Sequence, residues 1–254
     1  MTVRLSRISL AAVVLALSSG TFLAQNQSAR GLFVKSRPSS EDRKETPADA
    51  PETVALGYSL FLRDASNKAM RVNPARVFTA GDAIRILVES NASGHLYIFN
   101  QEGKDSIRMI YPDLRIRGGA TDVTAHVPLL LPSERTAAVG DTDWFVLSGA
   151  PQSEMLFAVF ATKPVSSWPS GKRLMGYKAG FALRWEDFRK TVRSVVESND
   201  QQVSQDEGEA MTIGEQTSLS RGLKLVRQDP APSVVKINTR KVDPFVIQIE
   251  LLRK

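Results

Sequence analysis

The stretch GHLYIFNQEGKDSIRMIY, residues 94–111, decides the fold class. Two runs rich in branched and aromatic residues, 94–100 and 106–111, flank the five polar residues QEGKD. A connection of this length is typical of a β-hairpin, and both runs have the composition of strands. The segment therefore predicts two antiparallel neighbouring strands.

Further short runs of the same texture lie on both sides of this hairpin, each bounded by Gly, Pro, Asn or Asp. Their spacing predicts an all-β, single β-sandwich-like domain over residues 57–254. MLFAVFA, within 155–161, is almost continuously apolar, which predicts a strand buried on both faces. The other predicted strands cover residues 58–63, 83–89, 122–127, 144–147, 177–184, 222–227, 234–238 and 245–252.

One helix is expected near residues 186–198 within this β-rich chain. Phe188, Val192 and Val195 or Val196 recur there at helical spacing. The polar and partly acidic stretch that follows, 199–218, predicts a mobile loop.

The N-terminal region predicts export. Arg4 and Arg7 precede the apolar run LAAVVLAL, residues 10–17, and small residues follow, which is the layout of a signal peptide over 1–24. The apolar run is too short to span a membrane, and no transmembrane segment is expected after its removal. Residues 25–56 are rich in Ser, Pro, Ala and mixed charge, so we expect a disordered N-terminal linker.

Composition excludes several classes of site and partner. The chain has no cysteine, which rules out disulfides and thiolate chemistry. Its formal net charge of +6 falls to +4 once Arg4 and Arg7 leave with the signal, and the charges are scattered, so no nucleic-acid surface is predicted.

The segment 77–164 carries an ordered set of features that resembles the family known as domain of unknown function 4384. The stretches LGYSLFLRD, residues 56–64, and FVIQIEL, residues 245–251, are similar to the flanks of longer members. The resemblance implies a compact β domain of exported bacterial proteins and brings no catalytic residue. Its features are Phe78, Gly81-Asp82, Ile84-Arg85, Gly94, Leu96, Tyr97, Phe99, Ile110-Tyr111-Pro112, Gly118-Gly119 and Val127-Pro128.

The histidine, serine and acidic residues fit no known catalytic or metal-binding pattern. The two histidines, His95 and His126, stand in no metal-ligand spacing, and His126 is predicted to be a surface strand residue. No G-x-S-x-G turn and no phosphate-binding glycine loop is present. Asp141 and Asp143 stand on either side of Thr142, directly before a predicted strand. This placement is typical of the entry to a strand rather than of a pair of glycosidase carboxylates. No catalytic residue, metal or cofactor is therefore predicted.

Aromatic side chains supply the only candidates for a binding surface. Trp144, within WFVL, is expected in the core, whereas Trp168 lies in the loop SSWPSGK and is expected to be exposed. Alternation places His95 on the same face as Tyr97 and Phe99. The candidate binding residues are Trp168, Tyr97 and His95.

These observations favour a non-catalytic module that is exported, to the periplasm or outside the cell. It would bind an envelope or secreted protein partner through loops or a sheet edge. Two alternatives stay open: a carbohydrate-binding module, which needs two or more of the aromatic rings in one exposed patch, and a hydrolase of envelope polysaccharide or peptide with acids from distant loops. The expected partner is accordingly a protein, with a glycan as the alternative, and the sequence does not identify the ligand further.

Overall fold

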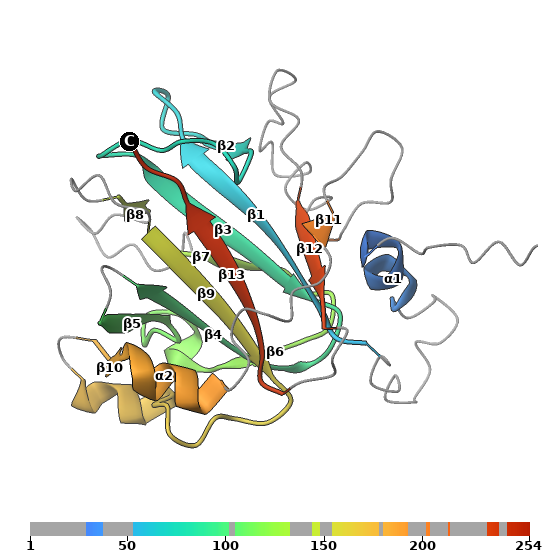
Figure 1. The fold of residues 1–254 in the computed structure, drawn as a ribbon, viewed down its shortest axis with the longest axis vertical. Helices are drawn as coiled ribbons and strands as arrows, with labels where there is room; N and C mark the ends of the chain where they lie inside the picture. Colours follow the sequence, from blue (N-terminus) through green and yellow to red (C-terminus); the bar gives the residue numbers. More distant parts are fainter. Residues whose placement is uncertain are drawn as a thin grey trace, which may run out of the picture.

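The computed structural model describes residues 29–37, 53–101, 105–132, 144–147, 154–177, 180–192, 202–203, 213, 233–238 and 243–254. Two antiparallel sheets pack face to face, which confirms the predicted β-sandwich (Figure 1). The expected signal peptide, the strand at 222–227 and the pair Asp141 and Asp143 lie outside the described residues. Among those that are described, no helix has the length and apolar character needed to cross a membrane.

The first sheet has β1 and β3 at its centre. Its order is β11 (Gln202–Val203), β12 (Val234–Ile237), β1 (Ala55–Arg63), β3 (Ala83–Ser90) and β7 (Leu129–Leu131). Two short strands join it at the sides, β2 (Ala69–Val72) beside β1 and β8 (Phe145–Val146) beside β3.

The second sheet is built around the predicted hairpin. Its order is β10 (Ala182–Arg184), β5 (Ser106–Tyr111), β4 (Gly94–Gln101), β9 (Glu154–Ala161) and β13 (Phe245–Leu251), and β6 (Asp122–Val123) also pairs with β4. β4 and β5 pair antiparallel, with Asn100 opposite Arg108, as the sequence predicts. β9 lies between β4 and β13, which is why its run is apolar on both faces.

The main core lies between the two sheets and follows the period of two. Alternate residues of β1 and β3 face it, and so do alternate residues of β4, β9 and β13. The final strand contributes Phe245, Ile247, Ile249 and Leu251 to this core, so the chain ends on a strand packed within the domain, as predicted. Burial of these side chains is the main stabilising contribution of the sandwich.

A second cluster covers the outer face of the second sheet. It brings strand residues together with α2 (Trp185–Val192) and with the segment after β9. Phe188 and Val192 are both buried, which confirms the predicted helical spacing, and residues 193–198 of the expected helix lie outside the described part. Two short 3-10 helices, η1 (Arg117–Gly119) and η3 (Gly171–Gly176), complete the described elements on this side.

The structure departs from the sequence predictions at several boundaries. Residues 29–37 were expected in a disordered linker, but they include α1 (Ala29–Lys35), which packs on the first sheet (Figure 1). The strands expected over 122–127 and 177–184 are confined to β6 and β10, because residues of positive φ, His126 and Gly180, turn the chain. Within the stretch expected to be a loop, residues 202–203 form β11 beside β12.

Candidate functional site

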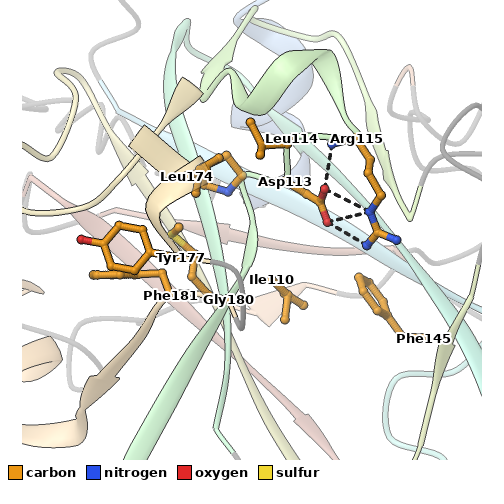
Figure 2. Close-up of a pocket in the computed structure, with 11 residues that line it drawn as sticks. Ile110, Asp113, Leu114, Arg115, Phe145, Leu174, Tyr177, Gly180 and Phe181 are labelled. Atoms are coloured by element: carbon orange, nitrogen blue, oxygen red, sulfur yellow. Dashed lines mark hydrogen bonds and ion pairs between the residues drawn. The ribbon is translucent and has the colours of Figure 1, made fainter. Parts of the chain in front are cut away.

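A pocket of about 390 Å³ opens beside the end of β5 (Figure 2). One wall is the turn after β5, and the opposite wall is formed by Leu174 of η3 and by Tyr177, Gly180 and Phe181, which precede β10. Phe145 of β8 reaches it from the other sheet. The residues lining it are Met109, Ile110, Pro112, Asp113, Leu114, Arg115, Phe145, Leu174, Tyr177, Gly180 and Phe181.

The turn after β5 is held by Asp113. β5 ends at Tyr111, because the next residue, Pro112, has no amide hydrogen for a ladder bond. The Asp113 carboxylate then accepts the Arg115 amide at 2.8 Å and the Arg115 guanidinium, with Nη2 at 2.8 Å and Nε at 3.1 Å. Figure 2 shows this ion pair at the edge of the pocket.

Ionisation of Asp113 reflects these contacts. Partial burial opposes the charged form, but hydrogen bonds from the Arg115 side chain and amide outweigh it and hold the pKa of the carboxyl below its ordinary value. Asp113 is therefore a carboxylate at neutral pH, and its charge is compensated within the same turn.

The opposite wall is held by backbone hydrogen bonds. The Tyr177 amide donates to the Leu174 carbonyl at 2.9 Å, and the Gly180 amide donates to the Tyr177 carbonyl at 2.8 Å. Gly180 has a φ of 83°, a conformation that favours glycine. Beyond this turn the Phe181 carbonyl accepts the Met109 amide at 2.9 Å, which joins the two walls.

η1 also fixes the position of η3. A Cβ atom on Gly119, whose φ is 80°, would lie 3.1 Å from the Gly171 amide nitrogen. Only glycine permits this approach, and the second glycine of the Gly118-Gly119 pair thus has a packing role. The wall that carries Leu174 and Tyr177 is positioned through this contact.

Several apolar side chains at the rim of the pocket are open to solvent. Leu114 is 38% exposed and Tyr177 is 43% exposed, and the Tyr177 ring stands edge-on to Phe181 with centroids 5.0 Å apart. Met175, next to Leu174 in η3, is 62% exposed. Large apolar side chains gathered around a concave site mark a binding surface.

The chemistry of this pocket is that of binding. Its lining is apolar apart from backbone atoms, the Tyr177 hydroxyl and the compensated Asp113–Arg115 pair. Across the described part of the chain, no group of three or more His, Asp or Glu side chains is placed to hold a metal ion. The site can accept an apolar group, with the ion pair available for polar contacts at its edge.

Two of the three predicted binding residues are buried elsewhere. Trp168 was expected to be exposed, but it is 1% exposed, and its ring lies 4.9 Å from Tyr97 and 4.7 Å from Phe99 between centroids. The prediction failed because the segment after β9 folds over the outer face of the second sheet and inserts the indole beneath α2. Tyr97 is fully buried, and its hydroxyl accepts the Val165 amide at 3.0 Å.

Sequence reasoning did not single out Asp113, Arg115 or Tyr177. The only local signal was Pro112, which predicts the end of a strand and hence a turn at this place. The pocket arises where this turn meets a segment far along the chain. No spacing in the sequence marks that meeting.

One wall of the pocket, the turn after β5, lies in a segment that matches a known protein family. Residues 77–164 match the family model described as a domain of unknown function (DUF4384). This confirms the resemblance over that segment. The DUF4384 region supplies β3 to β9, including the turn with Asp113 and Arg115, whereas Leu174 and Tyr177 lie beyond it. Neither the curated proteins nor the solved structures contain a significant match to the chain.

The two histidines of the DUF4384 region do not line the pocket. His95 lies in β4, and His126 follows β6. His95, the third predicted binding residue, is half-buried, and its Nδ1 lies 2.9 Å from the Thr121 hydroxyl. His126 was expected at the surface but is only 4% exposed. His126 lies in a turn, and its backbone amide donates to the Ser90 carbonyl at 2.7 Å. This bond places His126 against the first sheet.

His126 is part of a hydrogen-bonded row. Its Nδ1 lies 3.3 Å from Glu89 Oε1 and its Nε2 lies 3.2 Å from the Ser36 hydroxyl. The order Ser, His, Glu resembles that of hydrolase triads, in which the serine proton points to the imidazole. The Ser36 hydroxyl also lies 2.7 Å from the Phe33 carbonyl, so its single proton has two acceptors within reach, this carbonyl and the imidazole.

Proposed function

We propose that this chain is an exported, non-catalytic β-sandwich module that binds a partner protein through the pocket beside β5. The observation that carries the proposal is the pocket with the apolar side chains of Leu114 and Tyr177 exposed at its rim, beside the Asp113–Arg115 pair. The ligand is an extended segment of the partner that inserts an aliphatic or aromatic side chain between these two residues.

The lining favours a peptide anchor over a sugar. A sugar site requires several free hydrogen-bonding groups around a stacking ring, whereas the charged groups here satisfy each other. Trp168 and Tyr97, which would have formed an aromatic platform, are buried. An apolar side chain needs no such partners and gains free energy by leaving water, at about 25 cal/mol per Å² of apolar surface.

Export rests on the N-terminal sequence. The positive residues Arg4 and Arg7, the apolar run at 10–17 and the small residues after it have the arrangement of a secretory signal. The absence of cysteine is compatible with an oxidising compartment, because the fold then needs no control of disulfide pairing.

Selection from a displayed peptide library tests the proposal. We expect the wild-type protein to enrich peptides with a shared apolar anchor, and the double variant Leu114→Ser with Tyr177→Ser to lose them. Val127→Ser is the matched control, because Val127 is 55% exposed but does not line the pocket. Equal retention of the selected peptides by both variants would refute the site. Binding on a glycan array that the double variant abolishes would show that the ligand is a sugar.

A further inference from the structure

A second site lies on the outer face of the first sheet, where α1 packs beside β12 (Figure 1). α1 has seven residues, and three side chains at a spacing of three, Arg30, Phe33 and Ser36, contact the sheet side. This spacing puts them along one face of the helix and its final turn. Lys35, on another face, is exposed.

Phe33 is the apolar anchor of this contact. It is fully buried against Val235 and Ile237 of β12 and Ala55 of β1. Gly57 lies beneath the ring, because a Cβ atom at this position would be 3.8 Å from Phe33 Cζ. A larger side chain than alanine there would occupy space that the ring uses.

Polar contacts flank the anchor at both ends. Arg30 Nη2 donates to the Ser233 carbonyl at 2.6 Å, just before β12 begins. At the other end Ser36 lies against His126, whose ring also stands edge-on to Phe33 at 5.0 Å between centroids. The contacts therefore define the pattern Arg-x-x-Phe-x-x-Ser, and Leu32 and Val34, at two of its intervening positions, also pack against the Phe33 cluster.

The helix depends on this docking. Isolated helices shorter than about 12 to 15 residues are marginal in water, because nucleating the first turn is unfavourable. A seven-residue helix with a glycine at its third position is well below that length. α1 therefore owes its helical form to its contacts with the sheet.

We infer that the outer face beside β12 is a receptor site for a short helix of the pattern Arg-x-x-Phe-x-x-Ser, and that residues 30–36 occupy it as a separable ligand from within the same chain. Residues 37–54 connect this ligand to β1. The site is distinct from the pocket beside β5, because the two share no residue.

Binding of a labelled synthetic peptide of residues 27–38 tests this inference. The receptor is the full-length double variant Arg30→Ala with Phe33→Ala, whose own segment no longer competes. We expect saturable binding at least about tenfold tighter than to the wild-type chain, where the tethered segment competes at an effective concentration in the millimolar range. A peptide with the same two substitutions should not bind, whereas one with Lys35→Ala should bind unchanged. Equal affinity for both proteins, or no binding to the folded variant, would overturn the inference.

Hydrogen exchange on the wild-type protein gives a test that does not depend on the variant. A separable ligand opens without unfolding the sandwich, so amides of residues 33–37 should exchange faster than those of β4 and β9. The Arg30→Ala chain should accelerate exchange in this segment alone. If residues 33–37 exchange only as slowly as β9, α1 is an integral part of the core and the inference fails.

Discussion

The indole of Trp168 lies parallel to the phenyl ring of Phe188, with centroids 5.9 Å apart and an interplanar angle of 8°. The indole comes from the segment after β9 and the phenyl ring from α2. Their contact closes the outer face of the second sheet over Tyr97 and Phe99. Aromatic pairs in this position contribute both buried area and a specific geometry.

Replacement of Trp168 by alanine tests this contact. We expect Trp168→Ala to lower the free energy of unfolding by about 3 to 5 kcal/mol, because a large buried side chain is lost and a cavity remains. Urea unfolding measured by circular dichroism gives the value. Tyr177→Ala is the control, since this ring is 43% exposed, and it should change stability by less than about 1 kcal/mol. A mild effect of Trp168→Ala would place the indole outside the core.

Gly94 provides a second test, where β4 meets β9. A Cβ atom on Gly94 would lie 2.7 Å from the Ala161 carbonyl oxygen, a backbone atom that cannot move freely. Gly94→Ala should therefore destabilise the protein by about 1 to 3 kcal/mol. Gly176→Ala is the matched control, because no atom lies within 4 Å of its Cβ position. Equal thermal midpoints for the two variants would contradict this geometry.

The buried ion pair between Glu154 and Arg253 joins the start of β9 to the end of the chain. The Arg253 guanidinium donates to Glu154 Oε1 at 2.6 Å. The Arg253 side chain is 3% exposed and the Glu154 side chain is 10% exposed. Arg253→Ala should cost about 3 to 5 kcal/mol of stability, because it removes a charged hydrogen-bond donor from a buried carboxylate. Arg184→Ala, which removes an exposed pair with Asp187, should cost less than about 1 kcal/mol. Denaturant midpoints compare the two, and equal losses would be inconsistent with burial of the first pair.

Asp113 predicts a pH dependence at the pocket. Its pKa in the folded state is lower than the ordinary 3.8, so the carboxylate adds stability above about that pH and loses it as the pH falls through the folded-state pKa. Asp113→Asn should therefore weaken the protein at neutral pH, by less than about 1 kcal/mol because the pair is partly exposed, and should match the wild type in stronger acid.

The Arg115 contact can be tested by titrating the same carboxyl. Arg115→Gln should raise the Asp113 pKa toward 3.8, since it removes the charged partner and its side-chain hydrogen bonds. Carboxyl chemical shifts followed by NMR report this pKa directly. An unchanged Asp113 pKa in Arg115→Gln would show that the turn backbone, rather than the guanidinium, sets its ionisation.

Several features could be predicted because their causes are local. The hairpin of β4 and β5 follows from two strand-forming runs joined by a short polar loop. The face of α2 follows from the spacing of Phe188 and Val192, and the final strand follows from the alternation in FVIQIEL. In each case neighbouring residues carry the information.

α1 and His126 show where such reasoning stops. The segment 29–37 stands in a polar, charge-balanced stretch, and nothing in it indicates that Phe33 would find Val235 on a strand near the other end of the chain. His126 stands in a run that suggests a surface strand, yet a positive φ turns it onto Glu89. Both placements depend on partners that no sequence window contains.

The sequence by itself determined the all-β class, the similarity of residues 77–164 to DUF4384 and the strands of the core, because periodicity and turn residues act over a few positions. Only the tertiary structure decided which aromatic rings are buried and where a pocket forms. Trp168 is buried because it packs beneath α2. The turn at Asp113 forms the wall of a pocket because Tyr177 lies opposite it. The physical reason is that burial and concavity are properties of surfaces that meet in space, and residues distant in the sequence form those surfaces.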